Sequence, residues 1–397
     1  MTTTAQPPPA AGSMPGESPA SPLEWFRSFG RPPRIMGLDV ARALAILGMA
    51  GAHIGETTDF TWSEPETWSD VVNGRSSILF AVLAGVSVAL MTGRSRLPDR
   101  ERMPEHRLRL LGRGATIFLI GLFLEMLNTP IAVILTLYGL LYVAMIPFLR
   151  WRPWQLVTAS AALVVAGPPL LALLNALTLD PRGAGVDFVL YGHYPITAWL
   201  AFALGGMALG RMPLERLRTA AVTLAVGVAL AIAGYGLGAI GEAAGWGGGR
   251  ETSPPGDRAS GWATYADALD AVDPAGKTLD AVFAVEPHSG GIAELIGSGG
   301  FALAVIAICL LLTRPLRWVL LPFAALGSMP LSAYTIHVVG IFMMAGPGGL
   351  FSDNGIWGLS SVMLLAGATL WSAFIGRGPL ERLVGWSADR MAAVPAR

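Results

Sequence analysis

Apolar runs of membrane-spanning length dominate the pattern of this 397-residue chain. A helix needs about 20 predominantly apolar residues to cross the hydrocarbon core of a bilayer. Runs close to this length lie at 35–54, 76–92, 110–127, 131–149, 155–177, 196–210, 219–240, 295–313, 318–345 and 357–375. The sequence therefore predicts an all-α, polytopic transmembrane bundle of about ten helices.

Two of these runs depart from the common length. The run at 196–210 is short, and the run at 318–345 is long enough to tilt or to break at Met329–Pro330. The longest connection, 244–294, is Gly- and Pro-rich and holds a predicted amphipathic helix near 259–271. It is either a solvated spacer or a lid or binding loop.

The chain divides into one membrane domain and two flanking segments. Residues 1–33 are rich in Pro, Ala, Ser and Thr and predict a disordered leader, in which Trp25 and Phe26 begin an interfacial anchor. Residues 34–386 form the transmembrane domain, and residues 387–397 form a short tail.

Composition supports a membrane protein and excludes other classes. Hydrophobic residues make up 53% of the chain, charged residues make up 14%, and the formal net charge is zero. No continuous basic stripe suits a nucleic-acid backbone, so nucleic acid is not an expected partner. The single cysteine, Cys309, excludes an internal disulfide and a multi-thiolate metal site.

The arginines alternate from one loop to the next and so predict an orientation. With ten helices and a cytoplasmic N-terminus, most arginines fall in cytoplasmic segments, including six between Arg94 and Arg109. The outer segments hold only Arg75, Arg182, Arg250, Arg258 and Lys277. Both termini are therefore predicted to be cytoplasmic, in a multi-pass protein of the plasma membrane.

The first apolar run carries charged and titratable side chains at membrane depth. Asp39, Arg42 and His53 all fall within it, and each charge in the hydrocarbon core costs at least about 2.5–3.5 kcal/mol. Arg42 and His53 are eleven residues apart, which places them on nearly the same helix face about 16 Å apart along the axis. These side chains are expected to face protein, water or substrate.

Histidines are the main candidates for acid–base chemistry, because imidazole titrates near neutral pH. Of the five, four lie at the outer end of the predicted bundle. We name His53, His288 and His337 as candidate catalytic residues, and expect His193 and His106 to cap or pack helices. No His-x-x-x-His pair is present, so the sequence predicts no metal site.

Four charged residues are candidates for binding the substrate or donor. Asp39 and Arg42, at positions i and i+3, can pair with each other and still leave Arg42 able to bind an anion. Arg113 lies in the third run, and Arg75 lies just before the second. We name Asp39, Arg42, Arg75 and Arg113 as this set.

The order of these motifs resembles a known family. Leu38-Asp39-x-x-Arg42, then His53, then LFAVLAGVS is similar to the opening of the membrane-bound acyltransferase superfamily. ILTLYGLLYVAMIPFLR, YPITAWLAFALGGMALGR, GSMPLSAYTIHVVGIF and GPLERLVGW bring the chain closer to the heparan-alpha-glucosaminide N-acetyltransferase-like branch and the related uncharacterised bacterial membrane family. The resemblance covers residues 34–386.

The resemblance implies an enzyme that takes an acyl group, acetyl above all, from cytoplasmic acyl-CoA. The acceptor is a hydroxyl or amine of a glycan or envelope molecule on the other side of the membrane. His53 would be the catalytic imidazole, as general base or transient acyl carrier, and Arg42 would hold the donor or orient the site. The heparan-type enzymes carry a histidine just before a tryptophan that resembles Trp68, whereas this chain reads SEPETW.

Two interpretations follow from that difference: either His53 is the catalytic histidine in place of the missing loop histidine, or the fold has a function other than acyl transfer. We therefore predict a membrane acyltransferase with acyl-CoA as co-substrate and no bound cofactor. A transporter or flippase for a small anion or lipid-linked sugar, gated by Asp39 and Arg42, is the alternative. A scaffold or sensor explains the charged first run least well. The oligomeric state, a homodimer included, stays open.

Overall fold

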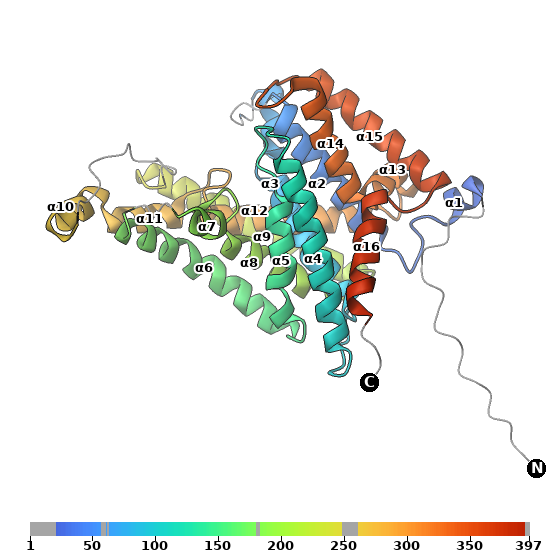
Figure 1. Cartoon of the computed structure of the whole chain (residues 1–397), viewed down its shortest axis with the longest axis horizontal. Coiled ribbons are helices and arrows are strands. Elements are labelled where there is room, and N and C mark those ends of the chain that lie inside the picture. Colours follow the sequence, from blue (N-terminus) through green and yellow to red (C-terminus); the bar gives the residue numbers. More distant parts are fainter. Residues whose placement is uncertain (1–20, 57–60, 62, 180–182, 248–260, 394–397) are drawn as a thin grey trace, which may run out of the picture.

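The computed structural model describes residues 21–56, 61, 63–179, 183–247 and 261–393. Every regular element among these residues is helical (Figure 1), which confirms the all-α part of the predicted fold class. The main helices are α2 (Met36–Ile54), α3 (Arg75–Met91), α4 (Met103–Glu125), α5 (Leu135–Ala144), α6 (Pro153–Leu177), α8 (Ile196–Gly210), α9 (Leu217–Ala243), α12 (Ile292–Leu312), α13 (Arg317–Gly327), α14 (Pro330–Ala345) and α15 (Asn354–Phe374).

Shorter elements complete the chain. They are α1 (Pro22–Ser28), η1 (Pro65–Val72), η2 (Ile146–Phe148), α7 (Ala184–Val186), η3 (Asp187–Tyr191), α10 (Trp262–Val272), α11 (Pro274–Phe283) and α16 (Pro379–Ala392). Several helices begin with proline in the first turn, where its missing N–H costs nothing.

The long run at 318–345 breaks, which is one of the two outcomes that its length predicts. Helices α13 and α14 meet at an angle of 73° across Ser328 and Met329. Pro330 occupies the first turn of α14, and the carboxylate of Glu381 on α16 accepts hydrogen bonds from the backbone N–H groups of Leu331 and Ser332 at 2.7 and 3.1 Å. The sequence motifs around Pro330 and Glu381 therefore meet at this break.

Among the described residues, six helices are long and apolar enough to cross a membrane, and a seventh span arises if α13 and α14 count as one. The remaining predicted runs are helical too, but α5 and α8 have only 10 and 15 residues. A crossing normally needs about 20 residues. Helix α4 is longer but carries several charges in its first half. About ten crossings therefore stay a prediction.

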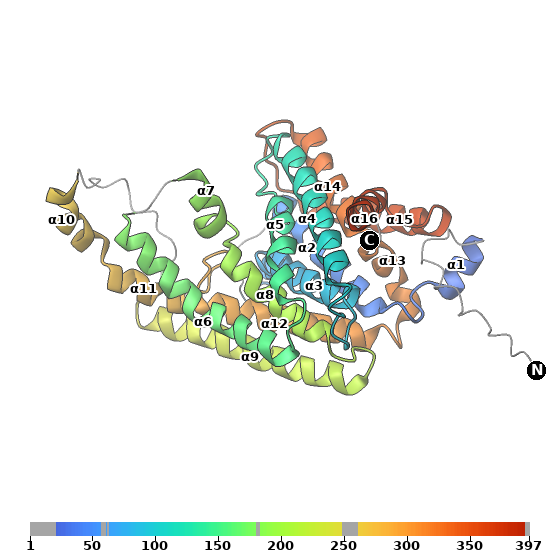
Figure 2. The same cartoon turned by 60° about the horizontal axis from the view of Figure 1, so that its bottom comes forward.

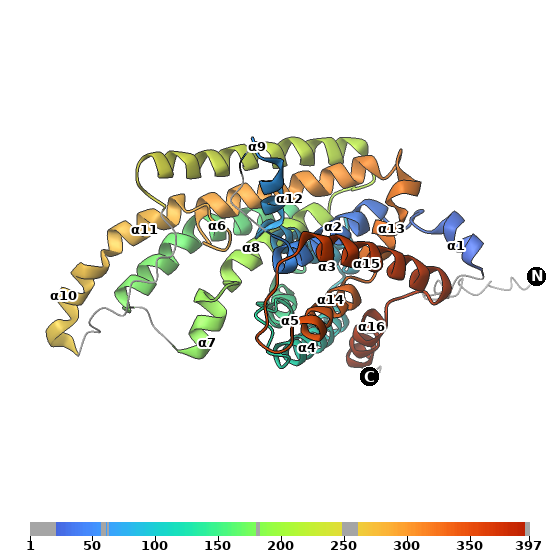
Figure 3. The same ribbon diagram turned by 90° about the horizontal axis from the view of Figure 1, so that it is seen from above.

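The helices form two sets that cross steeply. Figure 1 shows α6, α9 and α12 extended along the long axis while α4 and α5 stand across them, and Figure 3 views α4, α5, α14 and α16 close to end-on. Glycines allow α9 and α12 to approach closely: a Cβ on Gly227 would lie 2.6 Å from the backbone N of Ala304. Small residues at such interfaces are typical of membrane helices.

Hydrogen bonds gather the arginine-rich loops at one end of the molecule, which we call the arginine end. There Arg94 pairs with the carboxylate of Glu215, and Arg314 donates to the carbonyl of Glu215. Arg211 donates to the carbonyl oxygens of Arg94 and Leu149 at 3.1 and 2.5 Å. The loops after α3, η2, α8 and α12, all predicted to be cytoplasmic, thus lie together.

The loops predicted to face outward also lie together, at what we call the histidine end because it holds His53, His288 and His337. Asp353 donates its N–H to the carbonyl of Ile54 at 2.7 Å, and the Tyr194 hydroxyl donates to the carbonyl of Ala132 at 3.0 Å. Which end faces the cytoplasm stays a prediction.

The flanking segments and the long loop hold more helix than predicted. Within the leader, residues 1–20 lie outside the described residues, but α1 occupies 22–28 and Trp25 donates to the Ser372 hydroxyl at 3.0 Å. Part of the segment predicted as a leader is therefore helical, at 22–28. In the loop, α10 matches the predicted amphipathic helix and α11 was not predicted; residues 248–260 lie outside the described set. Figure 2 shows α10 beyond the end of α6, and α11 packs beside α6.

Candidate functional site

Helix α2 links the two ends of the molecule and supplies a side chain to each. Asp39 and Arg42 lie in its first two turns, and His53 lies in its last turn. Arg42 contacts α3 and His53 contacts α14. The two side chains therefore meet different neighbours although they lie on nearly the same face of α2.

At the histidine end, His53 and His337 form a direct pair. Nδ1 of His53 lies 3.0 Å from Nε2 of His337, and the rings are stacked 5.3 Å apart at 11°. His337 is buried, whereas His53 is partly exposed. Since one ring nitrogen must donate and the other accept, the contact couples the tautomers of the two imidazoles.

His288, the third predicted histidine, lies at the same end. Its ring packs edge-on against Tyr194, with the centroids 5.6 Å apart, and it interacts electrostatically with His53. Burial, and secondarily the neighbouring His193, lower the pKa of His288 to about 4. His288 is therefore neutral at physiological pH and can act as a base or hydrogen-bond partner but not as a fixed cation. The structure thus brings the three candidate histidines to one end.

At the arginine end, Asp39 is buried between two arginines. Its Oδ2 accepts from Nε of Arg34 at 2.5 Å and its Oδ1 accepts from Nη1 of Arg42 at 2.6 Å. Arg42 also donates from Nη2 to the Ser87 hydroxyl of α3 at 2.9 Å. The carboxylate therefore neutralises one charge and fixes the orientation of two guanidinium groups.

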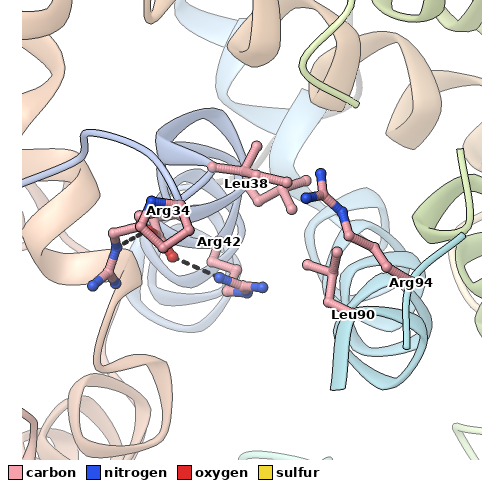
Figure 4. Close-up of a pocket in the computed structure, with 8 residues that line it drawn as sticks. Arg34, Leu38, Arg42, Leu90 and Arg94 are labelled. Atoms are coloured by element: carbon pink, nitrogen blue, oxygen red, sulfur yellow. Dashed lines mark hydrogen bonds and ion pairs between the residues drawn. The ribbon is translucent and has the colours of Figure 1, made fainter. Parts of the chain in front are cut away.

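A pocket of about 300 Å³ opens beside this ion pair (Figure 4). It is lined by Pro33, Arg34, Ile35, Leu38, Asp39, Arg42, Leu90 and Arg94. Arg94 reaches from beyond the end of α3 toward Leu38 on α2 (Figure 4). Three guanidinium groups face one carboxylate here, so the pocket itself carries an excess of positive charge and suits an anion. Glu215, which pairs with Arg94 from outside the lining, offsets part of that charge.

The other two predicted binding residues lie apart from the pocket. Arg75 begins α3 at the histidine end, where its Nε donates to the Tyr235 hydroxyl at 2.7 Å. It is separated from Arg94 by the whole length of α3. Arg113 on α4 contacts Met91, with Nη1 3.4 Å from the sulfur, and its buried Nε has no hydrogen-bond partner among the described residues.

Two residues that organise the site were not singled out from the sequence. Ser87, which binds Arg42, stands in an apolar helix where a serine is unremarkable. Glu294 is 3% exposed, and its carboxylate accepts hydrogen bonds from the loop that carries His288. A carboxylate in the first turn of an apolar helix was a signal that could have identified it.

No group of three or more His, Cys, Asp and Glu side chains suited to a metal ion occurs in the part of the chain that the structure describes.

Comparison with known proteins supports the motif resemblance. Residues 34–236 match the family described as heparan-alpha-glucosaminide N-acetyltransferase, catalytic. This region begins at Arg34 and contains Asp39, Arg42 and His53, whereas His288 and His337 lie beyond it. A search of curated proteins finds no match. Because the matched region spans more than half of the chain, the protein belongs to the heparan-alpha-glucosaminide N-acetyltransferase catalytic-domain family.

Proposed function

We propose that this protein is a multi-pass plasma-membrane acyltransferase that moves an acyl group, acetyl above all, from acyl-CoA to a glycan or envelope acceptor. The observation that carries the proposal is the arrangement along α2: an anion-accepting pocket at Arg42 and an imidazole pair at His53. Family membership supports acetyl as the group that is transferred.

The pocket at the arginine end suits the donor. The phosphates of CoA are anionic, and arginine donates bidentate hydrogen bonds to phosphate oxygens. Arg34, Arg42 and Arg94 surround the pocket, while Leu38 and Leu90 provide an apolar wall for the pantetheine arm. The abundance of arginine at this end supports a cytoplasmic location for it, where acyl-CoA is present.

The imidazole pair at the histidine end suits proton transfer to and from the acceptor. If His53 donates its Nδ1 proton to Nε2 of His337, its own Nε2 carries a free lone pair. That nitrogen can take the proton from an acceptor hydroxyl or amine as the acceptor attacks the thioester carbonyl carbon. The carbon–sulfur bond then breaks, CoA leaves as a thiolate, and the proton held by His53 returns to the thiolate.

His53 can alternatively carry the acyl group for a time. In that route Nε2 attacks the thioester, CoA thiolate leaves, and the acceptor then displaces the imidazole from the acyl carbon. Brief mixing with radiolabelled acetyl-CoA without acceptor, followed by acid quench and mass spectrometry of the His53 peptide, separates this route from direct transfer.

The test of the proposal is acyl transfer by purified protein in proteoliposomes that hold labelled acetyl-CoA on one side and amino- or hydroxy-sugar acceptors on the other. Removal of a general base costs about 10²- to 10⁴-fold, so His53→Gln should lose transfer by this factor while His106→Gln keeps it. Folded His53→Gln protein with full transfer would refute the assignment. Solute uptake that needs no acyl-CoA would instead support the transporter alternative.

A further inference from the structure

The loop that carries His288 is held by a single buried carboxylate. Glu294, in the first turn of α12, accepts from the backbone N–H of His288 at 2.7 Å and of Gly290 at 2.6 Å. It also accepts from the Ser289 hydroxyl at 3.0 Å. Three successive loop residues therefore point a donor at one carboxylate: two backbone N–H groups and, between them, a hydroxyl.

This arrangement keeps His288 in an unfavourable backbone conformation. Its φ is +64°, in the left-handed region, where a side chain with a Cβ is disfavoured and glycine is the usual occupant. A loop that needed only this turn would be easier to form with glycine at position 288, as it has glycine at Gly290 with φ +68°. Strained positions of this kind cluster at functional sites.

The side chain of His288 is directed at the site rather than at bulk solvent. It is half-buried and packs against Tyr194, whose ring lies edge-on to it at 5.6 Å between centroids. Pro287, the preceding residue, packs against Gly74 at the start of α3, where an added Cβ would come within 2.9 Å of the proline Cβ. The loop is thus held on one side by α3 and on the other by Glu294.

We propose that Glu294 is a positioning residue, which fixes the loop 286–291 so that the imidazole of His288 stays against Tyr194 at the histidine end. The carboxylate does not touch the acceptor; it acts through the backbone of residues 288–290. The kinetic consequence rests on the proposed acyl transfer, whereas the geometric consequence does not.

Glu294→Gln tests this role, because glutamine keeps the size of the side chain but offers only one acceptor oxygen. Glu286→Gln is the matched control, since Glu286 is an exposed carboxylate in the same loop. We measure the rate at which diethyl pyrocarbonate modifies His288 in the full-length protein, by mass spectrometry of its peptide. The rate should rise severalfold in Glu294→Gln and stay unchanged in Glu286→Gln. An unchanged rate in Glu294→Gln would overturn the proposal.

A double-mutant cycle tests whether Glu294 acts through His288. A misplaced group at a reacting centre costs up to about a hundredfold, so Glu294→Gln should lower kcat by about tenfold to a hundredfold with little change in the KM for acyl-CoA. In a His288→Gln background the same change should alter kcat by no more than about twofold. If the two substitutions instead lower kcat by factors that multiply in the double variant, Glu294 acts independently of His288, which would contradict the proposal.

Two further outcomes keep the inference separate from the proposed function. If Glu294→Gln does not fold, His288→Gly decides: glycine relieves the backbone strain, so wild-type transfer by this variant would overturn the role of His288 and hence of Glu294. If the wild-type protein transfers no acyl group, the proposed function fails, while the labelling rates still report whether Glu294 holds the loop.

Discussion

Nδ1 of His53 lies 3.0 Å from Nε2 of His337, which joins α2 to α14 across 284 positions of the sequence. Neither ring has a carboxylate hydrogen-bonded to it among the described residues. The partner that orients His53 is therefore a second, buried imidazole, and it can serve as donor or acceptor according to its tautomer. A carboxylate partner differs from this imidazole, because an ionised carboxylate can only accept a hydrogen bond from the histidine.

The first prediction concerns that pair. His337→Gln should keep more activity than His337→Ala, because the glutamine amide oxygen can still accept the Nδ1 proton of His53. We expect kcat to fall by about tenfold in the glutamine variant and by about a hundredfold or more in the alanine variant, with the donor KM preserved. Steady-state kinetics with varied acetyl-CoA measures both constants. Equal activity of the two variants would indicate that His337 only packs.

The second prediction concerns the donor pocket. Arg42→Lys should raise the KM for acyl-CoA by about tenfold, because one ammonium group cannot reach both Asp39 and Ser87 as the planar guanidinium does. Ser87→Ala removes one of these hydrogen bonds, and it should raise the KM by only about fivefold. Arg96→Lys, at an exposed arginine after α3, is the control. A loss of kcat at unchanged KM in Arg42→Lys would exclude donor binding by Arg42.

The third prediction concerns pH. Burial holds the pKa of His288 at about 4, below its ordinary value of 6.5. Between these values the unfolded chain binds a proton that the folded protein does not, so the free energy of unfolding falls as the pH is lowered from 6.5 to 4. The free energy of unfolding is therefore unaffected by His288 above pH 6.5 and is lower by up to about 3 kcal/mol at pH 4.

Thermal unfolding in detergent at a series of pH values checks this effect. On acidification the melting temperature should fall less in His288→Gln than in the wild type. His106→Gln, at the start of α4, should follow the wild type more closely. A wild-type and a His288→Gln protein with identical pH dependence would mean that His288 is not buried in its neutral form.

The local pattern was sufficient to predict the membrane helices. In lipid, the backbone N–H and C=O groups of an apolar run find no water, and a helix pairs them within the run whatever its neighbours are. The pattern also marked Met329–Pro330 as the place where the long run could break, since proline cannot continue the preceding helix without strain, but it left tilting open. The pattern did not predict the angles at which the helices cross or the number of membrane spans. Helices α5 and α8 are apolar but short, and how deeply they enter the membrane depends on the helices around them.

The candidate site was predictable as a set of residues but not as an arrangement. The sequence singles out His53, His288 and His337 one by one, because imidazole titrates near neutral pH, yet nothing local indicates which side chain each one meets. Arg75 was named for its charge, and the structure places it with Tyr235 at the other end of α3 from the pocket. Long-range packing selects such partners, and one sequence does not encode them in its spacing.

The fourth prediction concerns the junction of α14 and α16. Glu381 accepts from two backbone N–H groups of α14 and from the Ser332 hydroxyl at 2.5 Å. Glu381→Gln leaves at least one buried donor unpaired and should lower the free energy of unfolding by about 1–3 kcal/mol. Chemical or thermal unfolding in detergent measures it, with Glu286→Gln as an exposed control. A neutral Glu381→Gln variant would show that water satisfies these donors.

The last prediction concerns the packing of α3 against α8, which sets the position of the pocket. A Cβ on Gly206 of α8 would overlap the backbone of Val82 on α3, whereas a Cβ on Gly340 of α14 would meet no atom within 4 Å. Gly206→Ala should therefore force the helices apart and destabilise the protein by about 1–3 kcal/mol. Gly340→Ala should be neutral or stabilising by up to about 1 kcal/mol, because alanine favours the helix.

The same comparison has a functional consequence, because Arg94 follows the end of α3 and its carbonyl is held by Arg211 after α8. Separation of the two helices should displace Arg94 from the pocket and raise the donor KM in Gly206→Ala, while Gly340→Ala keeps it. Unfolding curves and donor titrations of the two variants, measured side by side, check both effects. A destabilised Gly206→Ala protein with an unchanged donor KM would place the donor elsewhere than beside Arg94.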